Sequence, residues 1–292
     1  MERRSALKLL TLGAAGSLGM TLSDLKKFTD DLPSDEKQPS IFLGHGSPMN
    51  AIEDNVFTRS LTTLGTSLKK PKAVLVVSAH WLSRGTMVST AMMPETIYDF
   101  GGFPPELSQV KYPAHGAPEE ARLVTKTITS TPVAEDETMG LDHGAWSVLR
   151  HIWPDASVPV FQMSIDWYKS PQWHYDLAQE LRVLRKKGIM IITSGNITHN
   201  LRNVVWDNID APAVDWAAEF DAAVKKNIDA RDHSKIINYN SLAPSASIAV
   251  PSNDHYLPLL YTLGSMEKDE AQTYTFEGFQ YGTISMRGLK IG

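Results

Sequence analysis

Four of the nine histidines stand in similar local settings, each near the end of an apolar run or near a helix start. His45 follows Ile-Phe-Leu-Gly, His80 follows Val-Leu-Val-Val-Ser-Ala, and His199 follows Ile-Ile-Thr-Ser-Gly-Asn-Ile-Thr. His255 lies in Pro-Ser-Asn-Asp-His-Tyr-Leu-Pro. The chain has no cysteine, so a bound metal must be held by His, Asp or Glu. Three imidazoles suit zinc or iron and leave a coordination position open for substrate or water.

The elements that would position these histidines alternate between strands and helices. Short apolar runs with polar or turn boundaries predict buried strands; they span residues 40–43, 73–78, 158–165 and 188–193. Apolar residues at helical spacing predict helices between them; these span residues 118–129, 144–152, 171–187 and 214–230. The pattern predicts a single-domain α/β fold, with a central, mostly parallel or mixed sheet flanked by helices. Because ligands bind beyond the carboxyl ends of such strands, we expect the metal site there.

The remaining histidines and the loops add detail. We expect a helix to begin at His255, with Asn253 or Asp254 as its cap. His143 is expected in a loop just before a helix, as a substrate contact, a contact behind the metal ligands or a cap. Residues 91–112 and 239–253 predict long loops, and the aromatic residues of the first would suit a pocket wall. Residues 274–286 predict a hairpin or edge strand. The other four histidines are interpreted as surface or packing residues: His115, His151, His174 and His233.

Residues 1–38 differ from the rest of the chain. The pair Arg3-Arg4 precedes Leu7-Lys8 and a short apolar run, and a polar stretch follows. This pattern is typical of a twin-arginine-type signal peptide with a linker, ahead of a catalytic domain at 39–292. We therefore expect export to the periplasm, with a cytoplasmic protein as the alternative, and no membrane attachment after processing.

The net charge and the lack of several known motifs argue against other classes of function. A net charge of -5 with no basic stripe argues against nucleic acid as a partner. The chain lacks a dinucleotide-binding Gly-x-Gly-x-x-Gly after a strand, a phosphate-binding loop and a Gly-x-Ser-x-Gly elbow. Ser47 lies near His45, but Pro48 follows it and no oxyanion-hole motif accompanies it.

Six motifs in order give the chain a family resemblance. From about residue 40 onward it resembles the 4,5-DOPA extradiol dioxygenase branch of the class III (LigB-type) extradiol ring-cleavage dioxygenases. The motifs are Gly44-His-Gly-Ser-Pro-Met49, Ser78-Ala-His-Trp81, Tyr98-Asp-Phe-Gly-Gly-Phe-Pro104, Leu141-Asp-His-Gly-Ala-Trp146, Gly195-Asn-Ile-Thr-His-Asn-Leu201 and Asp254-His-Tyr-Leu-Pro258.

The resemblance implies metal ligands at His45, His80 and His255, with His199 as the acid-base residue and a candidate fourth metal contact. It implies a substrate-side role for His143. The implied reaction is oxygen-dependent cleavage of a DOPA-like catechol ring with one divalent metal, Zn(2+) or Fe(2+). The wider family pairs two histidines with a glutamate, whereas His255 takes the third place here.

Two other classes of function compete with this interpretation. A zinc hydrolase would use the same histidines to activate water, with His199 as its general base. A non-catalytic metal-binding protein is the third interpretation. The sequence leaves open homo-oligomerisation, the catechol used and the bond cleaved.

Overall fold

The structure is a computed structural model, and it describes residues 36–292, which form one compact unit. The predicted signal peptide and linker at 1–38 lie almost wholly outside the described residues, so that assignment stays a prediction. Among the described residues, no helix has the length and apolarity needed to cross a bilayer.

An eight-stranded mixed sheet runs through the centre, in the order β4-β3-β5-β2-β6-β1-β10-β7. Its four central strands, β5, β2, β6 and β1, are mutually parallel. At one side β10 pairs antiparallel with β1, and β7 pairs antiparallel with β10. The bounds are β1 (Ser40–Gly44), β2 (Ala73–Ser83), β3 (Thr86–Ser89), β4 (Val133–Asp136), β5 (Val160–Asp166), β6 (Ile189–Gly195), β7 (Gln272–Phe276) and β10 (Gly288–Ile291). A separate small hairpin joins β8 (Phe279–Gln280) to β9 (Ile284–Ser285). The predicted α/β class and mixed sheet are therefore confirmed.

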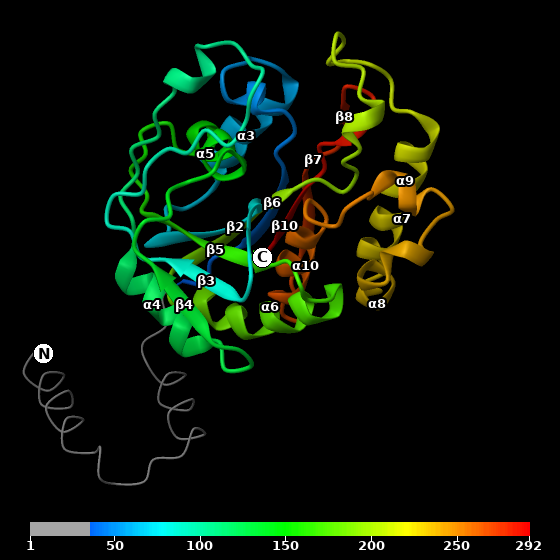
Figure 1. Cartoon of the computed structure of the whole chain (residues 1–292). Coiled ribbons are helices and arrows are strands. Elements are labelled where there is room, and N and C mark those ends of the chain that lie inside the picture. The colour runs from blue at the N-terminus through cyan, green and yellow to red at the C-terminus, as the bar shows by residue number, and fades with distance from the viewer. Residues whose placement is uncertain (1–35) are drawn as a thin grey trace, which may run out of the picture. The chain divides into compact units, whose positions relative to one another are not determined.

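Helices cover both faces of the sheet (Figure 1). Successive side chains of the central strands are buried in different cores. In β2, Leu75 and Val77 join one core, beneath the helices at 118–127, 171–185, 215–229 and 257–264. Val74 and Val76 join the other core, beneath the helices at 56–67 and 143–152. Strands that are covered on both sides have apolar residues at successive positions, which is why the sequence predicted them correctly.

The helices predicted at 118–129, 144–152, 171–187 and 214–230 form with small changes at their ends, and α3, α8 and α9 are helices that the sequence analysis did not predict. The bounds are α3 (Val56–Ser67), α4 (Pro118–Thr127), α5 (His143–Ile152), α6 (Pro171–Arg185), α7 (Asp215–Asp229), α8 (His233–Ile237), α9 (Ala246–Ala249) and α10 (Leu257–Gly264). Short 3-10 turns add η2 (Pro48–Ala51), η3 (Leu107–Gln109), η4 (Leu201–Asn203) and η5 (Tyr239–Ser241). The prediction of a long loop at 239–253 was wrong in part, because the short helical turns η5 and α9 lie within it. The prediction for 274–286 is confirmed by the edge strand β7 and the β8–β9 hairpin.

Candidate metal and catalytic site

The parallel strands bring the predicted histidines to one edge of the sheet. His45 directly follows β1, and His199 follows β6 by four residues. The two strands pair in register from Ser40–Ile191 to Gly44–Gly195, so their carboxyl ends coincide. The backbone N–H of His45 also donates to the Gly195 carbonyl (3.1 Å), which fixes the start of the first loop against the end of β6.

His80 lies inside β2 rather than after it, because the strand continues to Ser83. Its pairing with β5 is irregular: Val77 opposes Met163, but Leu82 opposes Ile165. Four residues of β2, including His80, therefore lie opposite one residue of β5. A bulge of this kind redirects a side chain.

His255 precedes α10, but the predicted cap was wrong. The N-cap of α10 is Tyr256, without a side-chain cap. The Asn253 carbonyl, rather than its side chain, accepts the N–H groups of Tyr256 and Leu257 (3.0 and 2.9 Å). The Asp254 carboxylate is hydrogen-bonded to Nδ1 of His255 instead.

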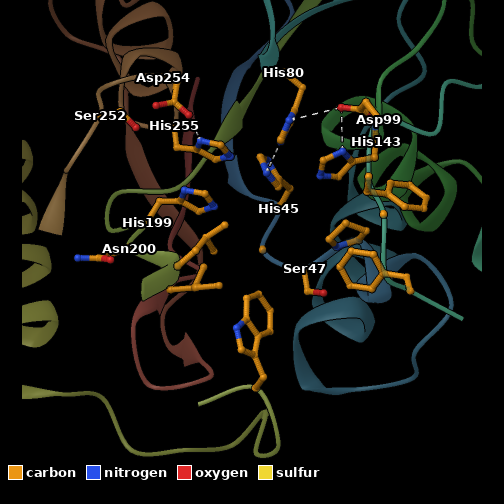
Figure 2. A pocket seen from close by; sticks show the side chains of 18 of the residues that line it. His45, Ser47, His80, Asp99, His143, His199, Asn200, Ser252, Asp254 and His255 are labelled. Carbon is orange, nitrogen blue, oxygen red and sulfur yellow. Dashed lines mark hydrogen bonds and ion pairs between the residues drawn. The ribbon is translucent and has the colours of Figure 1, made fainter. Parts of the chain in front are cut away.

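Three of the histidines form a nearly equilateral triangle (Figure 2). The ring centroids of His45 and His80 are 4.9 Å apart, those of His45 and His255 are 5.2 Å apart, and those of His80 and His255 are 4.9 Å apart. His143 packs against His80 at 3.9 Å, and His199 stacks on His255 at 3.5 Å. The five histidines singled out in the sequence thus gather around one point.

Each ring of the triangle has its Nδ1 atom held by a different partner. Nδ1 of His45 lies 2.9 Å from Oγ of Ser194, which donates its own proton to the Gly144 carbonyl (2.6 Å). Ser194 must therefore accept a proton from His45. Nδ1 of His80 faces the Asp99 carboxylate at 3.4 Å, and Nδ1 of His255 bonds to Asp254. In a neutral imidazole, a proton on Nδ1 leaves Nε2 with a bare lone pair.

With the proton on Nδ1, the Nε2 atom of each ring carries a free lone pair. The Nε2 atoms of His45 and His80 are only 3.1 Å apart, and Nε2 of His255 is buried without a hydrogen-bond partner among the described residues. Lone pairs directed at each other repel unless a cation lies between them. The three residues therefore fit a divalent metal that takes imidazole nitrogen ligands.

The electrostatic surroundings keep these rings neutral. Burial, followed by the neighbouring His80, lowers the pKa of His45 well below its ordinary value. Burial and the nearby His143 lower the pKa of His80, and burial and His199 lower that of His255. Only a neutral imidazole binds a metal, so the site is prepared for one at physiological pH.

Two sets of three side chains have ligand atoms within 4.8 Å of one another: His45, His80 and His143, and His199, Asp254 and His255. The predicted ligands are divided between these sets. The hydrogen bonds set Asp254 apart, because its carboxylate is bonded to Nδ1 of His255. They do not set His143 apart, because its Nδ1 is bonded to Asp99 (3.0 Å) and its Nε2 is free, as in the three predicted ligands. His143 and His199 remain on opposite sides of the triangle.

His143 is the first residue of α5 rather than a loop residue, and Asp142 is the N-cap that accepts from Ala145 N–H (3.0 Å). Asp99 accepts from both the backbone N–H and Nδ1 of His143, at 2.9 and 3.0 Å. His199 is held through its backbone N–H, which donates to the Ala249 carbonyl (3.0 Å). Burial lowers the pKa of His199 to about 4, although Asp254 opposes this, so its ring is a free base at neutral pH.

Asp99 and Ser194 are functional candidates that the sequence analysis did not identify. Asp99 lies 44 residues from His143, and Ser194 lies 149 residues from His45. A signal existed for Asp99, because it belongs to the Tyr98-Asp-Phe-Gly-Gly-Phe-Pro104 motif. A buried serine inside an apolar strand carries no such signal.

The histidines lie in a pocket of about 690 Å³. Phe100 and Phe103, from the predicted aromatic loop, line it, and Phe100 meets His143 edge to face with 5.6 Å between ring centroids. Flat aromatic ligands pack well against such ring edges and faces. His115, His151, His174 and His233 lie outside this pocket.

An α/β sheet with histidines converging at its carboxyl edge is an arrangement that suits a catalytic metal centre. Comparison with known proteins specifies the class. Residues 39–287 match the family described as the catalytic LigB subunit of aromatic ring-opening dioxygenase. The chain is 43% identical to the 4,5-DOPA dioxygenase extradiol of Escherichia coli K12, over 90% of this chain and 98% of that protein.

A plant relative and a solved structure also match most of the chain. The 4,5-DOPA dioxygenase extradiol of Beta vulgaris is 33% identical, over 88% of this chain and 97% of that protein. The crystal structure of an uncharacterized Escherichia coli K12 protein superposes with a TM-score of 0.77 at 40% identity, covering 87% of this chain and all of that one. The chain belongs to the LigB family of aromatic ring-opening dioxygenases, so the resemblance found in the sequence is confirmed.

Proposed function

We propose that this protein is an extradiol dioxygenase that cleaves the ring of a DOPA-like catechol with O2. A divalent metal, Zn(2+) or Fe(2+), would be held by His45, His80 and His255. The observation that carries the proposal is the convergence of the His45, His80 and His255 rings, 4.9–5.2 Å apart, in a pocket lined by Phe100 and Phe103, in a chain of this family. When bound, the metal supplies Lewis-acid binding of the two catechol oxygens, and iron would also supply redox chemistry toward O2.

The chain's own residues would orient the ring and move its protons. Phe100 and Phe103 give the substrate ring an apolar surface along one side of the pocket. His199 is neutral at pH 7 and can take a catechol proton at a ring nitrogen, then return it to the opened product. Because Asp99 holds Nδ1 of His143, Nε2 of His143 is left to accept a hydrogen bond from a substrate hydroxyl.

The decisive assay compares catechol turnover with and without O2 after loading with Fe(2+), and separately with Zn(2+). We expect a yellow ring-opened product only with O2. His199→Ala should lower kcat by about 100-fold or more while metal content is retained, as expected for a lost acid-base group. His115→Ala is the matched control, because this exposed histidine lies outside the pocket.

Other results would change the assignment. Oxygen-independent turnover of an ester or amide substrate would favour the zinc hydrolase, and stoichiometric metal with no turnover of any substrate would favour a non-catalytic role. Protein that binds no metal and gains no activity with Fe(2+) would refute the proposed site.

We also propose that residues 1–38 direct export by the twin-arginine route, supported by Arg3-Arg4. Intact mass of the protein recovered from the periplasm would show loss of this segment. Full-length protein confined to the cytoplasm would contradict the proposal.

A further inference from the structure

One cation lines the pocket besides the histidines. Arg202 belongs to η4, the short turn that follows His199 and Asn200. Its backbone is fixed because the Asn200 side chain accepts the N–H of Arg202 (3.0 Å). The same side chain donates to the Ile248 carbonyl (2.8 Å), which ties the turn to α9. Arg202 therefore starts from an anchored position at the pocket, although its side chain is exposed.

The other charges of the pocket are already engaged. Asp99 receives hydrogen bonds from His143, and Asp254 is bonded to His255. No carboxylate among residues 36–292 forms an ion pair with Arg202. Most other described arginines have a side-chain or carbonyl partner: Arg59, Arg84, Arg122, Arg182, Arg185, Arg231 and Arg287. The Arg202 guanidinium is thus free to bind an external group.

The size of the pocket leaves room for such a group. Its volume of about 690 Å³ lies within the range of sites that accept drug-sized ligands, so a catechol ring would not fill it. A ring bound among the histidines could extend a side chain toward the segment that carries Arg202. A planar guanidinium binds a carboxylate with two parallel hydrogen bonds, which a hydroxyl or an amine cannot match.

We propose that Arg202 determines substrate specificity by binding a carboxylate on the side chain of the catechol. This inference rests on the proposed ring-cleavage function and narrows its substrates to catechols with an anionic side chain. The same site should discriminate against an otherwise equivalent catechol whose side chain ends in an ammonium group, since two cations would then face each other.

The test uses three catechols that differ in the end of the side chain: 3-(3,4-dihydroxyphenyl)propanoate, 4-ethylcatechol and 2-(3,4-dihydroxyphenyl)ethylamine. We would measure kcat/KM in air, and Kd by calorimetry on the metal-loaded protein without O2. The carboxylate should be preferred over 4-ethylcatechol, and Arg202→Gln should reduce that preference about tenfold, mostly through KM. Arg202→Lys should restore part of it, and Arg202→Glu should shift preference toward the amine.

The control is Arg122→Gln, which removes the same charge from an exposed arginine outside the pocket and should leave the preference unchanged. An unchanged preference in folded Arg202→Gln and Arg202→Glu would overturn the inference. Binding preferences that follow Arg202 without any ring cleavage would support the carboxylate site and refute the proposed function. Failure to bind any of the three ligands would refute both.

Discussion

Replacing Asp99 by Asn should weaken the metal site although Asp99 is not one of its proposed ligands. The carboxylate accepts two hydrogen bonds from His143, at 2.9 Å from the backbone N and 3.0 Å from Nδ1, and faces Nδ1 of His80 at 3.4 Å. Asparagine can keep the acceptor for the backbone N–H, but its NH2 group would then face both Nδ1–H groups. Two N–H donors that face each other repel, so the substitution favours the imidazole tautomer with its proton on Nε2. In His80 that is the nitrogen proposed to bind the metal.

The size of the expected loss in metal affinity follows from the hydrogen bonds that Asp99→Asn removes. A hydrogen bond to a charged group contributes about 1.5–3 kcal/mol, so losing one should lower the metal-binding constant roughly 10- to 100-fold. Loss of a residue that supports a metal ligand gives a similar range in metal affinity or activity. We would measure metal affinity by competition with a chromogenic chelator, and kcat and KM with catechol. Asp269→Asn, an exposed change outside the pocket, is the control. Metal affinity and kcat equal to those of the original protein would refute the reasoning.

Two further predictions concern the scaffold. Although burial opposes it, hydrogen bonding to Arg185 lowers the pKa of Glu270 from 4.5 to about 2. Because the folded-state pKa is depressed, about 3 kcal/mol of stability should be present above pH 4.5 and lost as pH falls toward 2, and urea unfolding of Glu270→Gln should lack this dependence. In Gly195→Ala, the new Cβ would lie 2.2 Å from the His255 carbonyl oxygen, so we expect about 1–3 kcal/mol of destabilisation and weaker metal binding. Gly101→Ala, where an added Cβ meets nothing within 4 Å, is the control, and equal thermal stability and metal affinity of the two variants would contradict the argument.

The sequence predicted the elements whose pattern follows directly from burial. Strands covered on both faces are continuous apolar runs, and α4 and α6 begin with Pro118 and Pro171, a residue suited to the first helical position. Helix α3 was not predicted, because its run of threonines and serines has low helix propensity. It is stabilised by a capping box between Asn55 and Thr58 and by packing of its apolar side against the core, and the second of these depends on tertiary structure.

For the site, the sequence could place histidines near strand ends but could not determine which nitrogen each would present. That choice depends on Ser194, Asp99 and Asp254, and only Asp254 is adjacent in sequence to the ring it supports. The bulge that redirects His80 was also hidden, because β2 continues past the end of its apolar run. Only the fold brings these partners to the Nδ1 atoms of the three rings, which favours the tautomer that leaves Nε2 free for a metal. The loop that carries Asp99 also carries Phe100, so the orientation of the metal ligands and the shape of the substrate wall depend on the same few residues.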